Sequence, residues 1–159
     1  MPDKIKYTVT TTSPEKTKMM AETIGVWVEK GTVISLAGDL GSGKTSFVQG
    51  LAKGLGVPST YYITSPTFNI INEYPGRHRL FHIDIYRLTS MDELDDLGFF
   101  DIINGEGVVA IEWADKFPEH FLKEDISISI DMTDDTDRIF TIIISGQKNP
   151  DLIKNFDFK

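Results

Sequence analysis

Gly38-Asp39-Leu40-Gly41-Ser42-Gly43-Lys44-Thr45 decides the fold, because it fits the P-loop pattern G-x-x-x-x-G-K-[ST] at every fixed position. Residues 32–37 before it form a short apolar run rich in β-branched side chains, which predicts a buried strand. After it, apolar residues recur at helical spacing, so a helix is expected to start at about Lys44 or Thr45. In a strand, glycine loop and helix, backbone N–H groups and the helix dipole converge on a phosphate. The stretch therefore predicts a nucleotide-binding protein and not an ordinary glycine-rich turn.

Two side chains of this loop have predicted roles of their own. Lys44 reaches the β- and γ-phosphates, and the hydroxyl of Thr45 coordinates Mg²⁺. The glycines permit backbone angles and a close approach to phosphate that a Cβ would block.

The composition is that of one acidic domain. The chain has 159 residues, of which 40% are hydrophobic and 25% charged, as in ordinary globular proteins. It has no cysteine, which excludes disulfides and thiolate chemistry. No apolar run approaches the length of a membrane span, and the first residues lack a signal-peptide core. We therefore expect a cytoplasmic protein that does not contact membranes. The net charge of −8 argues against broad contact with RNA, so a partner would hold any RNA.

A second hydrophobic strand ends in an acidic residue. Residues 108–111 read as a buried strand, and Glu112-Trp113 follows directly. P-loop proteins keep the carboxylate that orients Mg²⁺ and its waters at such a position. Thr45 directly, and Glu112 directly or through water, are the predicted metal ligands. The alternative for Glu112 is a surface glutamate that starts a helix.

A predicted antiparallel hairpin lies between these two strands. Residues 69–74 and 80–88 read as its strands, on either side of a Pro-Gly turn. Just before it, Thr67 follows a proline in a loop that could cover the γ-phosphate, although these residues alone favour a plain β-turn.

Asp84 is a further candidate for chemistry. Strict alternation puts it on one face of its strand with His82 and Tyr86. It could orient an attacking water, hold a water of the metal, or pair with Arg87, and a role in the site is the favoured interpretation. His82 is interpreted as a satisfied structural histidine.

The remaining segments predict the rest of the sheet and its helices. Residues 7–11 predict a short edge strand, and Ser13 with Pro14 predicts the start of a helix. The core face of that helix is expected to carry Met19, Met20, Ile24, Trp27 and Val28. Short helices are expected at 91–98 and 115–122, and an antiparallel strand pair at 126–130 and 138–144.

Together these elements predict an α/β fold, a P-loop NTPase-like three-layer sandwich with a mixed, partly parallel sheet. The strand before the P-loop and the strand before Glu112 are expected to be parallel neighbours, with helices on both faces. Residues 1–159 are expected to form a single nucleotide-binding domain, in which the polar segment 148–159 is either mobile or docks on a partner.

No arginine is an obvious arginine finger. Arg77 and Arg79 lie in the hairpin turn, Arg87 at a strand end, and Arg138 far along the chain. A site of this type should hydrolyse its nucleotide slowly until a partner completes it.

The motifs, taken together, resemble one family. The P-loop is followed by Ser65-Pro66-Thr67-Phe68, His82-Ile83-Asp84-Ile85-Tyr86-Arg87-Leu88, Glu93-Leu94 with Leu97-Gly98, and Ile111-Glu112-Trp113. Their order and spacing are similar to those of the TsaE family, the small bacterial P-loop ATPases of tRNA threonylcarbamoyladenosine synthesis. The resemblance extends from about Ser13 to Trp113. It departs mildly at Ser42, where alanine is common, and at Phe68, where tyrosine is frequent.

The resemblance implies that the chain binds ATP or ADP with Mg²⁺ and hydrolyses ATP weakly alone. It also implies work with the TsaD and TsaB proteins in the modification of tRNA adenosine 37. On this basis residues 40–45 hold the phosphates, Thr45 and Glu112 bind the metal, and Asp84 belongs to the catalytic set with Lys44. Thr67 would lie in a switch-like segment and Trp113 near the nucleotide, while the loop at 11–13 would touch the base.

Two other functions remain open at this stage. P-loop kinases share the same phosphate cradle, but they need an acceptor pocket and usually a lid with arginines, which this chain does not clearly show. A nucleotide-dependent interaction module, whose bound state matters and whose hydrolysis does not, would need the same phosphate and metal ligands as the ATPase.

Overall fold

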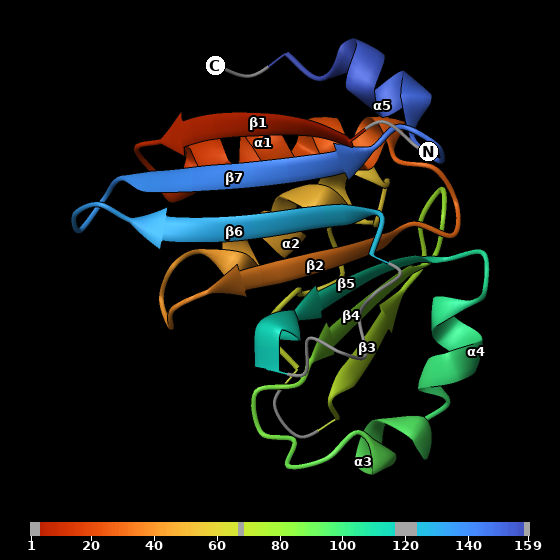
Figure 1. The fold of residues 1–159 in the computed structure, drawn as a ribbon. Helices are drawn as coiled ribbons and strands as arrows, with labels where there is room; N and C mark the ends of the chain where they lie inside the picture. Colours follow the sequence, from red (N-terminus) through yellow and green to blue (C-terminus); the bar gives the residue numbers. More distant parts are fainter. Residues whose placement is uncertain (1–3, 67–68, 117–123, 158–159) are drawn as a thin grey trace.

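One mixed sheet of seven strands carries the fold (Figure 1), in the order β1-β7-β6-β2-β5-β4-β3. The computed structural model describes residues 4–66, 69–116 and 124–157. The strands are β1 Lys4–Thr11, β2 Val33–Gly38, β3 Ile71–Tyr74, β4 Leu80–Asp84, β5 Val108–Glu112, β6 Ile126–Met132 and β7 Arg138–Ser145. β2 pairs in parallel with β5 and β6, and β5 with β4, whereas the other three pairs are antiparallel. The predicted mixed, partly parallel sheet is confirmed.

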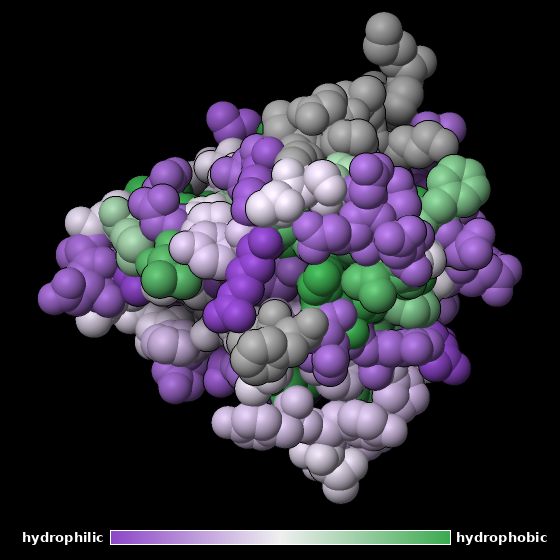
Figure 2. Space-filling model, turned by 90° about the horizontal axis from the view of Figure 1, so that it is seen from below, coloured by the Kyte–Doolittle hydropathy of each residue, from purple (hydrophilic) through white to green (hydrophobic). Residues whose placement is uncertain are grey.

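Helices pack on both faces of this sheet. They are α1 Pro14–Trp27, α2 Lys44–Gly54, α3 Asp92–Asp95, α4 Phe99–Ile103 and α5 Pro150–Asn155, with a short 3₁₀ helix at Ala114–Lys116. The larger hydrophobic cluster joins α1, α2 and α5 to the sheet, and the smaller one joins α3 and α4 to its other face. The end of the molecule near β3 and α3 has a largely hydrophilic surface around a hydrophobic area (Figure 2). Within the described ranges, no helix has the length and apolar character of a membrane span.

Helices α1 and α2 approach each other through glycines. A Cβ on Gly25 would lie 2.3 Å from the carbonyl oxygen of Leu51, and a Cβ on Gly50 would lie 2.3 Å from that of Lys18. Real Cβ atoms do not approach backbone so closely, so any larger side chain would push the helices apart. Because α2 begins within the P-loop, this contact also fixes the position of the loop.

The predicted core face of α1 needs correction. Met20, Ile24 and Val28 are fully buried as expected, but Met19 is 60% exposed and Trp27 is 39% exposed. The buried positions repeat every three or four residues along one side of the helix, and Met19 lies on the opposite side. Trp27, at the last helical position, lies at the margin of the buried stripe. The prediction that Met19 and Trp27 are core residues is wrong.

The segment after β4 also differs from the prediction. The predicted strand 80–88 ends at Asp84, because Asp84 Oδ1 accepts a hydrogen bond from the backbone N–H of Tyr86 at 2.9 Å. An aspartate that bonds the backbone two residues ahead makes a turn and stops a strand. Helix α4 was not predicted, and most of the helix predicted at 115–122 lies outside the described residues.

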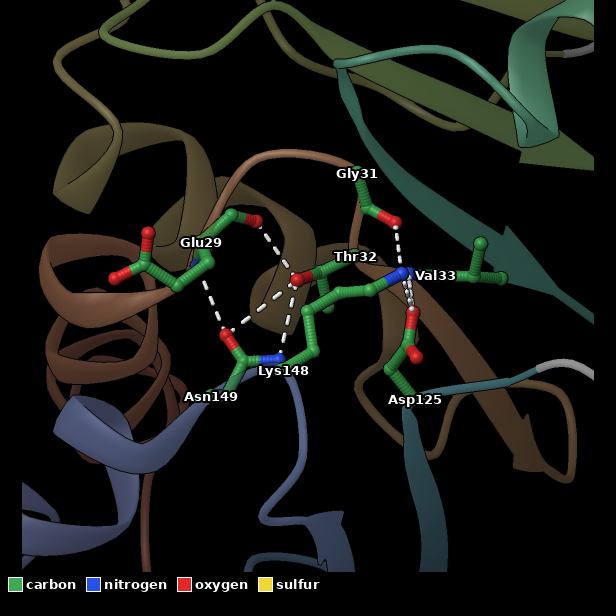
Figure 3. Close-up of polar contacts among 7 residues, drawn as sticks. All are labelled: Glu29, Gly31, Thr32, Val33, Asp125, Lys148 and Asn149. Atoms are coloured by element: carbon green, nitrogen blue, oxygen red, sulfur yellow. Dashed lines mark hydrogen bonds and ion pairs between the residues drawn. The ribbon is translucent and has the colours of Figure 1, made fainter. Parts of the chain in front are cut away.

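The C-terminal segment packs against its own domain (Figure 3). The side chain of Asn149 is fully buried, and its Oδ1 accepts a hydrogen bond from the N–H of Glu29 at 2.8 Å. Its Nδ2 donates to the hydroxyl of Thr32 at 3.1 Å. Beyond it, Leu152 and Phe156 are buried in the larger hydrophobic cluster. The structure thus places the segment up to Phe156 against α1, the loop between α1 and β2, and Tyr7 of β1, where these contacts hold it.

We expect Asn149→Ala to lower the free energy of unfolding by about 1–3 kcal/mol, because it removes the acceptor of the Glu29 N–H and leaves the buried Thr32 hydroxyl with only its bond to the Glu29 carbonyl. Urea denaturation followed by circular dichroism measures this loss. Asn155→Ala is the matched control, because Asn155 is exposed and its side chain donates to the carbonyl of Asp151 within α5. Its loss should stay within about 0.5 kcal/mol, and equal losses for the two variants would contradict the role of Asn149.

Candidate nucleotide site

The carboxyl ends of β2, β4 and β5 meet at one edge of the sheet, where the P-loop leaves β2 (Figure 1). In the parallel register Leu36 is level with Glu112, and Asp84 is level with Glu112 on the other side. A cleft of 350 Å³ opens there, and its lining includes Leu40, Gly41, Gly43, Lys44, Thr45, Ser46, Ser65, Asp84, Tyr86, Glu112 and Trp113. Ligands of open α/β sheets bind at this end of the strands. The structure therefore brings together most of the residues predicted from sequence.

The P-loop has the backbone geometry that its glycines predict. Gly41 has φ +80° and Gly43 φ +109°, in the left-handed region that favours glycine. Gly43 directly precedes α2, and no side chain caps this helix end. The first N–H groups of a helix lack partners within the helix and attract anions.

Lys44 lies deep in the loop. It is only 5% exposed, and its Nζ donates to the carbonyl oxygens of Gly38 at 2.5 Å and Asp39 at 3.1 Å. The same ammonium lies 3.8 Å from the ring centre of Trp113, which is a cation–π contact. Burial lowers the pKa of Lys44, and the carboxylates of Glu112, Asp115, Asp84 and Asp39 oppose that shift. The charged lysine is thus held by carbonyls, an aromatic face and nearby acids.

The two predicted metal ligands are linked by a third side chain. The hydroxyls of Thr45 and Ser65 lie 2.5 Å apart, and the Ser65 hydroxyl donates to Glu112 Oε2 at 3.3 Å. Hydroxyl and carboxylate oxygens are ligands that Mg²⁺ accepts, together with waters and phosphate oxygens. In the described part of the chain no group of three or more His, Cys, Asp or Glu residues forms a metal cage. The residues fit a Mg²⁺ ion that is held partly by a nucleotide.

Asp84 lines the same cleft. Burial raises its pKa above the ordinary 3.8, the N–H of Tyr86 opposes that shift, and the negative charge of Glu112 adds to it. Its ionised form is therefore less stable in the folded protein than in the unfolded chain. Thr67, which was predicted to reach this cleft, lies outside the described residues.

His82 is closer to the site than the sequence indicated. It is fully buried, and its Nε2 is hydrogen-bonded to Glu112 Oε2, while its Nδ1 has no partner among the described residues. The prediction of a satisfied structural histidine is therefore wrong for Nδ1. The alternation that placed His82 beside Asp84 was the available signal, but only the pairing of β4 with β5 shows the contact with Glu112.

Arg138 lies beside the P-loop, a position that was not predicted from the sequence. At the start of β7, its Nε donates to the carbonyl of Ser42 at 3.1 Å and its Nη2 to that of Gly41 at 3.3 Å. Its Nη1 donates to the carbonyls of Asp134 and Asp137, both at 3.0 Å. Arg138 also lines a 260 Å³ cleft with Thr12 and Ser13, part of the loop predicted to touch the base. No sequence motif marks this contact, because it depends on the return of β7 across the sheet.

A larger cleft of 480 Å³ lies at the opposite end of the strands, but its basic residues are already engaged. Arg77 donates to the carbonyl of Gly25 at 2.8 Å and to other carbonyls at the end of α1. Arg79 pairs with Glu73 at 2.6 Å, and Lys30 with Glu106 at 3.6 Å. The smaller cleft is the better candidate for an anionic nucleotide, because the P-loop and the uncapped start of α2 line it.

We expect Asp84→Asn to raise the free energy of unfolding in metal-free buffer at pH 7. The folded state holds the Asp84 proton more tightly than the unfolded chain does. Above its folded pKa, the ionised Asp84 therefore lowers the free energy of unfolding. Below pH 3.8 this cost disappears, because the carboxyl is protonated in both states. The asparagine oxygen still accepts from Tyr86. Because Asp84 is only half-buried, the gain should be less than about 1 kcal/mol, and it should shrink as the pH falls.

Urea denaturation at pH 7 and at lower pH measures this gain. Asp134→Asn is the control, for which we expect a change of opposite sign. The N–H groups of Asp137 and Thr136 lower the pKa of Asp134, so its ionised form stabilises the fold at neutral pH. This variant should lose stability at pH 7. A loss of stability in Asp84→Asn as well, or a gain independent of pH, would contradict the role of burial at Asp84.

The fold and the cleft define a P-loop NTPase-like α/β protein, and comparison with known proteins gives its family. A family model for the threonylcarbamoyl adenosine biosynthesis protein TsaE matches residues 11–140. A TsaE protein from Bacillus subtilis is 40% identical over 87% of this chain and 85% of its own length. One from Treponema pallidum is 38% identical over 82% of this chain and 95% of its own. The chain belongs to the TsaE family, whose members serve the biosynthesis of tRNA threonylcarbamoyladenosine.

The fold agrees with a solved structure. The crystal structure of Bacillus subtilis YdiB superposes with a TM-score of 0.73 at 34% sequence identity. The match covers 98% of this chain and 95% of that one, so the likeness includes the whole sheet and not the P-loop unit alone.

Proposed function

We propose that this chain is a Mg²⁺-dependent ATP-binding protein that hydrolyses ATP weakly alone. We further propose that it acts with TsaD and TsaB in the threonylcarbamoylation of tRNA adenosine 37. The observation that carries the proposal is the convergence of the P-loop, Asp84 and Glu112 on one cleft in a member of the TsaE family.

The proposed roles follow the geometry of the cleft. The N–H groups of Gly38–Thr45 and the ammonium of Lys44 bind the phosphates, and Trp113 holds Lys44 in place beside the nucleotide. Thr45 and Glu112 hold Mg²⁺, which neutralises phosphate charge when it is bound. Asp84 lies beside Glu112 at the strand ends and orients the attacking water. Thr67, outside the described residues, is proposed to act in a switch-like segment.

The positions of three arginines support the proposed weak hydrolysis. Arg138 directs its three guanidinium nitrogens to carbonyl oxygens, and Arg77 and Arg79 lie at the opposite end of the sheet. A P-loop site without an arginine finger is slow until a partner provides one or reorders the site. The net charge of −8 favours a partner protein as the component that holds tRNA.

We expect Lys44→Ala and Glu112→Ala to abolish threonylcarbamoyladenosine formation in a reaction reconstituted with TsaD, TsaB and tRNA, because each removes a predicted contact with the phosphates or the metal. Mass spectrometry of digested tRNA measures the product. Lys53→Ala is the matched control, because Lys53 lies on α2 with an exposed side chain paired to Glu22. It should support normal modification.

Two controls make the result specific. Circular dichroism must show that both site variants are folded, and a fluorescent ADP analogue must show that Lys44→Ala has lost nucleotide affinity. Normal modification by either folded variant would overturn the proposed role of that residue. Full modification by Asp84→Asn that binds ATP without hydrolysing it would favour an interaction module over an ATPase.

A further inference from the structure

The contact between His82 and Glu112 joins two neighbouring parallel strands below the cleft. In the register of β4 and β5, Asp84 is level with Glu112 and His82 is level with Ala110, two residues farther from the cleft. Both partners are buried, His82 completely and Glu112 to 2% exposure. A carboxylate with so little access to water depends on the protein for its hydrogen bonds.

The hydrogen bonds assign the proton of His82. If Nδ1 carried the hydrogen, a buried donor would lack a partner among the described residues, and the lone pair of Nε2 would face a carboxylate oxygen. The tautomer with the hydrogen on Nε2 avoids both costs and leaves on Nδ1 only a lone pair without a partner among the described residues. His82 therefore donates to Glu112 Oε2.

A second donor reaches the same oxygen. The hydroxyl of Ser65 donates to Glu112 Oε2 at 3.3 Å and is itself 2.5 Å from the hydroxyl of Thr45. Within the described part of the chain, both donors thus engage Oε2, which leaves Oε1 as the oxygen to present to the cleft that Glu112 lines. Two bonds to one oxygen fix the rotation of a carboxylate group.

We propose that His82 is a positioning residue, which orients the Glu112 carboxylate for metal binding by donating from Nε2. The inference rests on the proposed role of Glu112 as a metal ligand. Side chains that orient metal ligands typically change metal affinity about 10–100-fold when they are replaced.

His82→Gln and His82→Asn form a matched pair, because they carry the same amide on side chains of different reach. The glutamine amide nitrogen can occupy the place of Nε2, whereas the asparagine amide is one methylene too short. The paramagnetic resonance signal of free Mn²⁺ would give the Mn²⁺ affinity of each variant in the presence of ADP. We expect His82→Asn to bind Mn²⁺ about tenfold more weakly and His82→Gln to stay close to the unmodified chain.

A readout without metal separates positioning from damage to the fold. Affinity for a fluorescent ADP analogue in EDTA should be equal in both variants, because Glu112 then has no metal to hold. Equal Mn²⁺ affinity of both variants, whether normal or reduced, would overturn the positioning role. Glu112→Gln tests the proposed function separately: if it binds Mn²⁺ normally, Glu112 is no ligand and the inference falls with it.

The tautomer can be measured on the unsubstituted chain. A long-range ¹H–¹⁵N spectrum in EDTA should show the hydrogen of one imidazole on Nε2, and this signal should vanish in His82→Gln. A hydrogen on Nδ1 alone would overturn the proposal even if no His82 variant folds.

Discussion

The site depends on the parallel pairing of β5 with β2 on one side and β4 on the other. That pairing puts the P-loop, Asp84 and Glu112 at one edge of the sheet, although they are far apart in the sequence. It is stabilised by the burial of Val108 and Ala110 in the larger hydrophobic cluster and of Val109 and Ile111 in the smaller one. A slip of one residue in β5 would turn Glu112 to the other face and remove it from Thr45 and Ser65.

Charge balance is the second constraint on this edge. The ammonium of Lys44 is buried beside several carboxylates, which together favour its charged form against the cost of burial. Burial, and to a lesser extent the negative charge of Glu112, raise the pKa of Asp84, so the fold holds the charge of Asp84 at some cost. Functional sites commonly keep such groups at the expense of stability. The proposed magnesium nucleotide fits this edge, because the positive metal would offset the repulsion between Asp84 and Glu112. Its negative phosphates would pair with the ammonium of Lys44.

Local signals predicted much of this arrangement. The apolar strands before the P-loop and before Glu112 are continuous runs, which are typical of strands buried on both faces, and each leads directly into a predicted site residue. The contacts of His82 and Arg138 could not be predicted in this way, because they depend on which strands become neighbours. The early end of β4 depends on one hydrogen bond from the backbone N–H of Tyr86 to the side chain of Asp84, which competes with the strand pattern. The exposure of Met19 shows that a hydrophobic residue in a helix need not belong to its core face.

The central claim is that this edge is an ATPase site that a partner completes. The most direct test is the rate of Mg-ATP hydrolysis by the purified chain, first alone and then with TsaD, TsaB and tRNA. The account predicts a slow rate alone that rises strongly in the complete mixture, because a partner would complete the site. A fast rate alone that the partners leave unchanged would contradict it.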